Sequence, residues 1–377
     1  MRCDEGSLRC PVSGGVLLAD SPHSLAAGMR WPVVDGIPFL RADRLELAKA
    51  ALAALDAGRD EKALVLLLAD QDGWARTPPA SEAERRAVVR GRAKISFREA
   101  MDRLAFGPVG TYFAHRWSDP TFLSGLALAE AHGVGGRVLE LACGAGHYLR
   151  EFARVADVVV GGDIVFAKLW LARHYVVPRA RLVCFDAGVA WPFADGAFDT
   201  VFCHDAFYFL PEKPHVAAEM QRVAPRVLVG HAHNALVDNL SSGSPLAPGA
   251  YAALFDRPLM YDDRELTSAL VEARAPRPVG AEALADAPAV SWASGAGVGQ
   301  AVAGGLALPQ PGTALRRNPL YDAGVLRYPS ERYASEYGSL ATYPATAEGP
   351  ETAVAGSDAV IELLARRRVL LDLPASW

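Results

Sequence analysis

The chain has 377 residues, of which 51% are hydrophobic and 21% charged, and its formal net charge is -5 at pH 7. This composition is typical of a folded globular protein and excludes an intrinsically disordered chain. The negative charge gives no general attraction to phosphate backbones, so a nucleic-acid substrate is disfavoured. Because the length exceeds that of most single domains, we expect one α/β core with smaller segments at both ends.

Neither a membrane span nor secretion is indicated. The strongest apolar run, residues 63–69, is far shorter than the roughly 18 residues that a spanning helix needs. The N-terminal residues lack the apolar run of a signal peptide. We therefore expect a cytoplasmic protein without disulfides, whose last three cysteines are buried small apolar residues; the five are Cys3, Cys10, Cys143, Cys184 and Cys203.

Residues 1–42 are predicted to form a small β-rich unit, and residues 43–118 a helical region. A turn at 11–15 and the Asp35-Gly36 pair between apolar residues favour hairpins in the first segment. The apolar spacing over 45–70 predicts two helices separated at Gly58. A third helix is predicted over 81–106 and a fourth near 121–132.

Residues 119–235 are predicted to be the core. From Arg137 onward, short apolar strands alternate with helical stretches, which indicates a mostly parallel sheet covered by helices on both faces. Helices are expected to start near Gly146, Val165 and Pro214, and strands to lie near 137–142, 157–162, 181–185, 199–203 and 226–231. Residues 236–377 form a C-terminal extension, with a helix at 263–272, a Gly-rich stretch at 295–305 and a helix and strand over 358–373; we expect it to complete the sheet and to form the substrate region.

A glycine turn follows the first core strand in Glu140-Leu141-Ala142-Cys143-Gly144-Ala145-Gly146. Residues without a side chain allow the main chain to lie against a nucleotide-like cofactor where a strand turns into its helix. Gly144 and Gly146 are therefore the predicted cofactor turn.

Acidic side chains follow at the ends of the next strands. Asp163 is placed to accept hydrogen bonds from ribose hydroxyls, and Asp186-Ala187 to reach an adenine edge. His204-Asp205 ends the fourth strand and faces the transferable group. Ligands bind at these carboxyl ends in open α/β sheets. The alternative is that the acids merely cap helix N-termini.

The principal rival is a dinucleotide-binding fold, hence a nicotinamide-dependent oxidoreductase. Its fingerprint is Gly-x-Gly-x-x-Gly, in which the third glycine lets the helix approach and aim its N-terminus at a pyrophosphate. Leu149 stands at that third position. A cofactor without phosphate needs only the first two glycines, so the pattern favours S-adenosylmethionine.

Residues 125–234 resemble the class I S-adenosylmethionine-dependent methyltransferase superfamily. The resemblance is carried by residues 138–146, which match its first motif, and by residues 193–201 ahead of the fourth strand. It implies a Rossmann-like sheet, S-adenosyl-L-methionine as cofactor, and methyltransferase activity. It also implies that Glu140 orients the methionine amino group through the loop, that Asp163 binds ribose and that Asp186 holds adenine; the neighbouring residues Ala142, Ile164 and Ala187 complete the expected cofactor site.

The first 42 residues are similar to the zinc-ribbon-like activator domain associated with tRNA and release-factor methyltransferases, through residues 8–13 and 32–38. Ser13 stands where metal-binding members carry a second cysteine after the Cys10-Pro11 pair. Four zinc ligands cannot be assembled from the remaining cysteines, so we expect the unit to be structural and free of metal.

His204 is the predicted general base, because the fourth strand ends beside the methyl group in this fold and a histidine titrates near neutrality. Asp205 orients it or contacts the acceptor; alternatively, both only satisfy nearby backbone groups. His231 is a second catalytic candidate. With His233 it faces one side of its strand, a pair that can also bind a metal, but without a third identifiable ligand no metal is expected.

Tyr112 and Arg116 precede the core and are expected to contact the methionine carboxylate, unless their helix simply packs Phe113 and Trp117 into the core. The Asp/Asn-Pro-Pro-Tyr motif of base-modifying enzymes is absent after the fourth strand. The predicted function is therefore methylation of a small-molecule acceptor at oxygen, nitrogen or carbon. The alternatives are the oxidoreductase and a non-catalytic cofactor-binding scaffold protein, and nothing indicates the oligomeric state.

Overall fold

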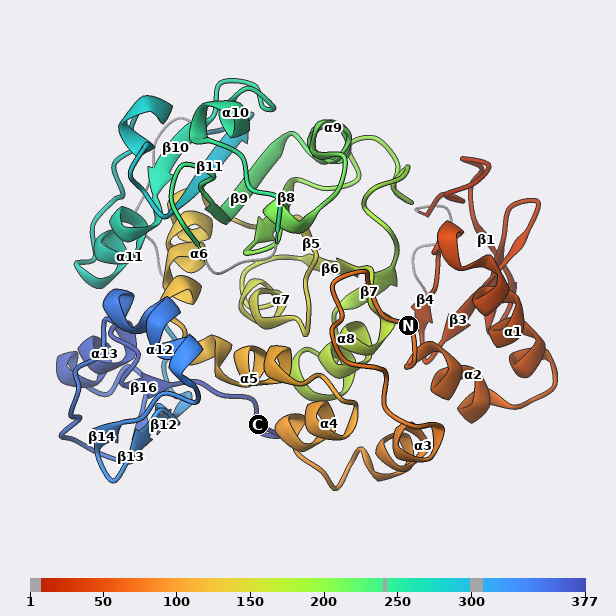
Figure 1. Ribbon diagram of the computed structural model, residues 1–377, viewed down its shortest axis with the longest axis horizontal. Helices are drawn as coiled ribbons and strands as arrows, with labels where there is room; N and C mark the ends of the chain where they lie inside the picture. The colour runs from red at the N-terminus through yellow and green to blue at the C-terminus, as the bar shows by residue number, and fades with distance from the viewer. Residues whose placement is uncertain (1–7, 240–242, 299–307) are drawn as a thin grey trace.

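The computed structural model describes residues 8–239, 243–298 and 308–377. Cys3 and most of the Gly-rich stretch at 295–305 lie outside these residues. At its centre is a seven-stranded sheet (Figure 1), built in spatial order from β10 (Leu259–Asp262), β11 (Ala289–Gly295), β9 (Arg226–His233), β8 (Thr200–His204), β5 (Arg137–Leu141), β6 (Val158–Asp163) and β7 (Arg181–Cys184). Strands β5 to β9 pair in parallel, β11 runs antiparallel to β9, and β10 runs antiparallel to β11.

The two faces of this sheet carry separate apolar cores. Val138, Phe202 and Leu228 belong to one core, and the residues next to them in sequence belong to the other. This division follows from the alternation of side chains along a strand, with both faces covered. The predicted α/β sheet with helices on both faces is confirmed.

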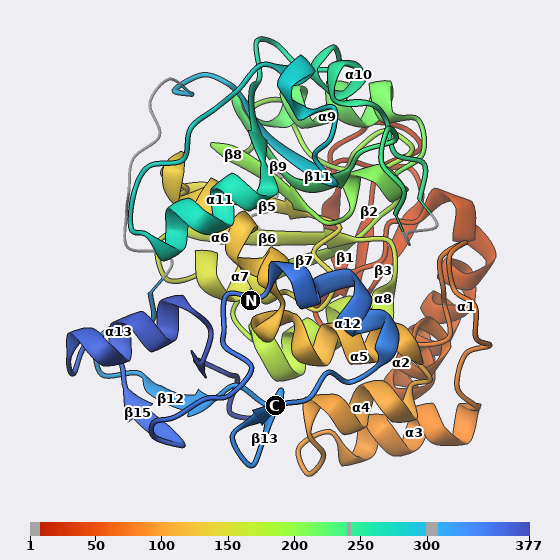
Figure 2. The same cartoon turned by 60° about the vertical axis from the view of Figure 1, so that its left-hand side comes forward.

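Helices pack on both faces of the sheet (Figure 2). The first face carries α6 (Pro120–Ala131), α7 (His147–Phe152), α8 (Phe166–Leu171) and α11 (Asp263–Val271). The second carries α9 (Lys213–Val223) and α10 (Pro248–Ala252). Helices α7, α8 and α9 begin within a residue of the predicted positions. Within the described ranges, every helix is too short or too polar to cross a membrane.

The N-terminal residues form an antiparallel sheet of β1 (Leu18–Ser21), β2 (Ser24–Ala26), β3 (Arg30–Val34) and β4 (Ile37–Pro38). Asp35 and Gly36 both take positive φ values in the predicted hairpin turn. The buried Phe39 belongs to the first apolar core of the large sheet, and the buried Trp31 belongs to the second. The backbone N–H of Leu40 donates to the carbonyl of Cys184 over 2.7 Å, which docks this unit on the free edge of β7.

The helical region begins with α1 (Leu45–Asp56) and α2 (Asp60–Leu67), separated at Gly58 as predicted. The single helix predicted over 81–106 is wrong, because two helices occupy it, α3 (Glu82–Gly91) and α4 (Phe97–Arg103). The Ser96 hydroxyl accepts a hydrogen bond from the Glu99 backbone over 3.2 Å and thereby starts a new helix. Helix α5 (Pro108–His115) then leads into the core.

The last described segment, 308–377, forms a lobe of small elements beside α5 (Figure 2). Its buried Tyr333, Tyr337 and Tyr343 make an apolar cluster. The indole N–H of the last residue, Trp377, donates to the carbonyl of Ala114 over 2.7 Å, so the end of the chain lies on α5. The elements are β12 (Ala314–Arg317), β13 (Tyr321–Asp322), β14 (Val325–Leu326), α12 (Glu331–Tyr337), β15 (Thr352–Val354), α13 (Ala359–Arg366) and β16 (Leu370–Leu371).

Candidate functional site

The glycine turn between β5 and α7 is formed by a series of left-handed backbone conformations. Ala142 has φ +53°, Gly144 φ +54° and Gly146 φ +82°. The backbone N–H of Gly144 donates to Oδ2 of Asp163 over 2.9 Å. The predicted neighbourhood of this turn and the carboxylate at the end of β6 is therefore present.

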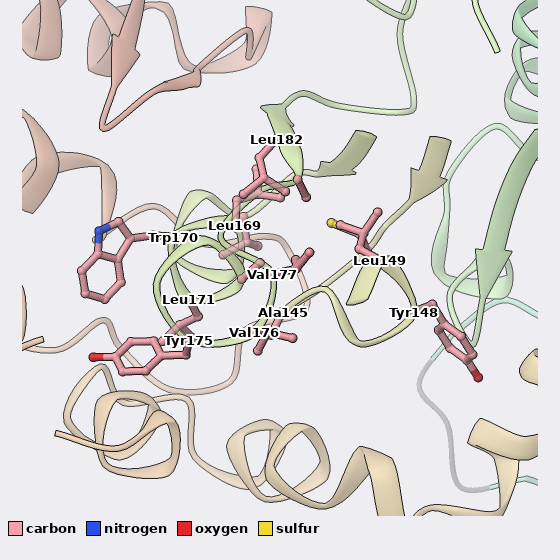
Figure 3. Close-up of a cluster of buried hydrophobic side chains, with 14 of the residues drawn as sticks. Ala145, Tyr148, Leu149, Leu169, Trp170, Leu171, Tyr175, Val176, Val177 and Leu182 are labelled. Atoms are coloured by element: carbon pink, nitrogen blue, oxygen red, sulfur yellow. The ribbon is translucent and has the colours of Figure 1, made fainter. Parts of the chain in front are cut away.

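Packing explains why these positions hold glycine. A Cβ at Gly146 would lie 2.9 Å from Cγ1 of Val177, and one at Gly144 would lie 3.1 Å from Cζ of Phe113. The ring of Phe113, from α5, thus covers the turn. Leu149, at the position of the missing third glycine, is fully buried among apolar side chains (Figure 3) and packs against Gly161 of β6.

Asp163 holds the loop after β6 together. Its Oδ1 accepts the backbone N–H of Val165 over 2.9 Å and lies 3.8 Å from Nζ of Lys168. The next residue, Ile164, offers its carbonyl to the guanidinium of Arg41 over 3.0 Å. The Asp163 carboxylate therefore accepts hydrogen bonds from local backbone groups, as expected if the acidic residues cap helix N-termini. One of these donors, Gly144, belongs to the glycine turn.

Asp186 and Ala187 follow β7, at the third strand end where they were expected. Oδ1 of Asp186 accepts the backbone N–H of Gly188 over 2.8 Å. The carbonyl of Ala187 accepts the indole N–H of Trp191 over 3.1 Å. Both residues shape the loop beside the Asp163 turn.

Glu140 lies within β5, beneath the turn, and is buried. Its Oε2 has no hydrogen-bond partner. Burial raises the pKa of this carboxyl well above its usual range, against a backbone hydrogen bond at Leu149 that lowers it. A buried polar oxygen without a partner is costly, which makes Glu140 the group in this turn that most needs a ligand.

The structure separates the two residues predicted to contact the methionine carboxylate. Arg116 reaches the end of β8, where its guanidinium donates to Oδ2 of Asp205 over 2.7 Å and to Oδ2 of Asp119 over 3.2 Å. Tyr112 turns toward the C-terminal lobe instead, because its hydroxyl donates to Glu336 over 2.7 Å and its ring stacks on Tyr333.

His204 ends β8 and points under α6. Its ring lies 4.8 Å from that of Tyr148, and a Cβ at Gly125 of α6 would lie 2.7 Å from its Nδ1. Neither ring nitrogen has a hydrogen-bond partner. Burial, followed by the charge of His231, lowers the pKa of His204 to about 3. The expectation that His204 titrates near neutrality is therefore wrong; the ring is neutral and weakly basic.

His231 and His233 lie at the end of β9, beside Asp205. Their ring centroids are 5.2 Å apart, and the rings of His231 and His204 are 5.9 Å apart. His231 takes a positive φ of +50° where β9 shifts register against β11. Nδ1 of His231 lies 2.6 Å from Oδ2 of Asp263. Burial lowers the pKa of His231, but the carboxylate of Asp263 outweighs it and raises the pKa to about 9.

Three polar side chains of this site were not predicted. Asp263 opens α11 and accepts the hydroxyls of Ser124 over 2.8 Å and Ser291 over 2.5 Å, besides facing His231. These residues come from α6, α11 and β11, far apart in sequence. An acid at the start of a helix signals only an N-terminal cap, so the sequence offered no sign of its contact with His231.

Comparison with known proteins yields one family match and several similar folds. Residues 139–226 match the methyltransferase domain family. No curated protein matches the chain. The family match covers the glycine turn, the Asp163 loop and the end of β8 described above.

Three solved structures illustrate the similar folds. One is the complex of the Haloferax volcanii Trm112 methyltransferase activator with a candidate methyltransferase, at 15% identity, TM-score 0.37, covering 54% of this chain and 98% of that one. The second is Haemonchus contortus phosphoethanolamine N-methyltransferase 2 with phosphomonomethylethanolamine and S-adenosylhomocysteine, at 19% identity, TM-score 0.37, covering 53% and 59%. The third is an amino pentose methyltransferase of Micromonospora echinaspora with bound S-adenosylmethionine, at 28% identity, TM-score 0.28, covering 33% and 56%.

All three TM-scores lie below 0.5, so the identification depends on the family match and on the site itself. The sheet places the glycine turn, the carboxylate at the end of β6 and the polar end of β8 at the carboxyl ends of three neighbouring parallel strands. Together with the match over residues 139–226, this arrangement identifies a methyltransferase domain in this part of the chain.

Proposed function

We propose that the enzyme methylates a small-molecule acceptor that binds at the carboxyl ends of β8 and β9. The observation that carries this proposal is the gathering of His204, Asp205, His231 and His233 beside Arg116, next to the glycine turn. The net charge of -5 gives no general attraction to the phosphate backbone of a nucleic acid. Buried polar groups that converge on one point suit a small acceptor held in a fixed orientation.

The residues of the turn fit S-adenosylmethionine. The unpartnered Oε2 of Glu140 can accept a hydrogen bond and so orient the methionine ammonium group through the loop. The Asp163 carboxylate can exchange its hydrogen bonds with the backbone for hydrogen bonds with the ribose hydroxyls. Asp186 and Ala187 border the adenine side. When bound, the cofactor supplies a methyl group already activated by its sulfonium. Much of the catalysis then comes from holding the acceptor in line and excluding water.

We assign His204 the role of general base, which accepts the proton of the methyl acceptor. The ring is neutral at pH 7 and both nitrogens are free, so it can accept a hydrogen bond from a hydroxyl or amine without first losing a proton. Arg116 holds Asp205 and limits how far that carboxylate can turn. A weak base suits an acceptor whose proton is already acidic, or an amine that loses its proton after transfer.

Residues 1–42 are assigned a supporting role for the cofactor loop. Arg41, just beyond β4, is almost fully buried and links Asp70, over 2.7 Å, to the carbonyl of Ile164, over 3.0 Å. The unit thereby fixes the residue next to Asp163. We propose that it acts as a built-in counterpart of the activator domain that it resembles, with the helices of 43–118 connecting it to the core.

The test is transfer of a labelled methyl group from S-adenosylmethionine to a panel of phenols, alcohols and amines, with calorimetry of S-adenosylhomocysteine and NAD alongside. Methyl transfer to a panel member, with no affinity for NAD, supports the proposal. Affinity for S-adenosylhomocysteine without transfer to any acceptor would favour the cofactor-binding scaffold instead. Affinity for NAD alone would favour the oxidoreductase.

A further inference from the structure

Asp205, His231 and His233 form a cluster of metal-ligating groups. One ligand atom from each residue lies within 4.8 Å of the ligand atoms of the other two. Within the residues that the structure describes, no other group of three histidine, cysteine or acidic side chains meets this criterion. With bonds of about 2.0–2.2 Å, ligands on one ion lie roughly 3–4 Å apart, so small side-chain rotations would close the site.

The partners of these side chains leave ligand atoms available. Asp263 holds Nδ1 of His231 at 2.6 Å, so Nε2 is the nitrogen free to bind an ion. Metal-bound histidines almost always have such a carboxylate or carbonyl partner, which fixes the ring and its tautomer. Asp263 is itself fixed by two serine hydroxyls, from Ser124 and Ser291. The support of His231 is therefore built before any ion binds.

Asp205 keeps acceptor capacity despite its two partners. Its Oδ2 accepts from Arg116 over 2.7 Å and its Oδ1 from the hydroxyl of Tyr208 over 2.7 Å. A carboxylate offers about four lone-pair positions, so either oxygen can bind an ion as well. Asp205 also takes a positive φ of +52°, as His231 does with +50°. Strained backbone at two strand ends is a feature of functional sites, where the surrounding structure fixes it.

The charges around the cluster favour a cation. Three carboxylates, those of Asp119, Asp205 and Asp263, gather with the guanidinium of Arg116. All are buried or nearly so. With His231 neutral, as metal binding requires, a divalent ion at this point would balance the two negative charges that Arg116 leaves.

We propose that Asp205, His231 and His233 bind a divalent first-row transition metal ion, with Zn²⁺ as the reference ion, at the acceptor side of the active site. Two imidazoles and one carboxylate suit such ions, whereas Mg²⁺ and Ca²⁺ prefer oxygen ligands alone. Three protein ligands leave a coordination position open. That position would take the oxygen or nitrogen of the acceptor, a role that rests on the proposed methyl transfer. The ring of His204 lies 5.9 Å from that of His231, and both of its nitrogens lack a hydrogen-bond partner.

The experiment measures metal binding without cofactor or acceptor. Tag-free full-length chain is stripped with a chelator and titrated with Co²⁺, followed by visible absorption, and with Zn²⁺ by calorimetry. We expect one ion per chain and the absorption bands of a site with nitrogen and oxygen ligands. His233→Ala should abolish stoichiometric binding, and Asp263→Asn should weaken it by roughly 10- to 100-fold.

The matched control is His174→Ala. His174 also pairs with an aspartate, Asp35, over 2.6 Å, but outside the active site. Its removal should leave the Zn²⁺ titration unchanged, and circular dichroism should report folded protein for every variant. His233→Gln serves as a second ligand variant if His233→Ala fails to fold. Wild-type protein that binds no stoichiometric ion, or ligand variants that bind as tightly as wild type, would overturn the proposal; affinity for S-adenosylhomocysteine, measured separately, reports on the proposed function.

Discussion

Replacing Gly146 tests why the cofactor turn needs a residue without a side chain. An alanine there would place its Cβ 2.9 Å from Cγ1 of Val177 and 3.1 Å from Cβ of Ala172, at φ +82°. The left-handed conformation costs an alanine about 1–2 kcal/mol, and an extra methyl in a packed core costs about 1–3 kcal/mol. We therefore expect Gly146→Ala to lower the free energy of unfolding by about 2–5 kcal/mol.

Gly196→Ala separates the two contributions. Gly196 has φ +61°, but no atom lies within 4 Å of the Cβ that it would gain. Its replacement should cost only the conformational part, about 1–2 kcal/mol. Urea denaturation followed by tryptophan fluorescence and by circular dichroism gives both free energies, provided that the two signals coincide. Equal losses for the two variants would show that packing of the turn against Val177 and Ala172 is not what demands glycine.

Three further predictions concern single side chains. Asp163→Asn leaves one oxygen for the two backbone N–H groups that the carboxylate now accepts, so stability should fall by about 1–3 kcal/mol and calorimetry should show weaker S-adenosylhomocysteine binding; an unchanged affinity would remove Asp163 from the site. His204→Ala should lower the rate of methyl transfer while cofactor affinity stays nearly constant, and an unaltered rate would end its assignment to the acceptor's proton. Burial and then the charge of Arg226 lower the pKa of His132 to about 4, so the folded state binds fewer protons than the unfolded state between pH 6.5 and about 4. Stability should therefore fall on acidification by about 1.4 kcal/mol per pH unit from this group, and His132→Gln should show a shallower decline in urea denaturation at pH 4.5, 5.5 and 6.5; parallel curves would contradict this.

The contact between the glycine turn and Asp163 was predictable because its signals are local. Gly144, Gly146 and Asp163 belong to one strand, turn and strand unit, and their contact follows from parallel pairing of β5 with β6. The alternation of short apolar runs with helical stretches likewise predicted the strands. One available signal was missed: Ser96 followed three residues later by Glu99 is the pattern of a capping box, which marks the start of α4.

The acceptor side could not be predicted in the same way. The network around His231 depends on Asp263, Ser124 and Ser291, which only the folded sheet and its helices bring together. The low pKa of His204 depends on burial under α6, and pKa shifts of this kind have no signature in sequence. No third metal ligand was identified from the sequence, although Asp205 was already a candidate site residue. The folded sheet brings Asp205 close to the two histidines, with positive φ values at Asp205 and His231.

The covering of the turn by Phe113 was also outside the reach of sequence. The segment around Phe113 was expected either to touch the cofactor or to pack into the core, and the structure divides these roles among neighbouring residues. Phe113 lies on Gly144, Arg116 turns to Asp205, and Tyr112 joins the tyrosines of the C-terminal lobe. That division depends on where residues 308–377 fold, and no local pattern in α5 encodes it.

The central claim is that the turn at Gly144, together with Asp163, binds S-adenosylmethionine. Calorimetric titration of S-adenosylhomocysteine into the wild-type chain and into Asp163→Ala tests it most directly. We predict one site per wild-type chain, no heat with NAD, and binding at least tenfold weaker in the variant, about 1.4 kcal/mol. Equal affinity in the two proteins, or a wild-type chain that binds NAD and not S-adenosylhomocysteine, would contradict it.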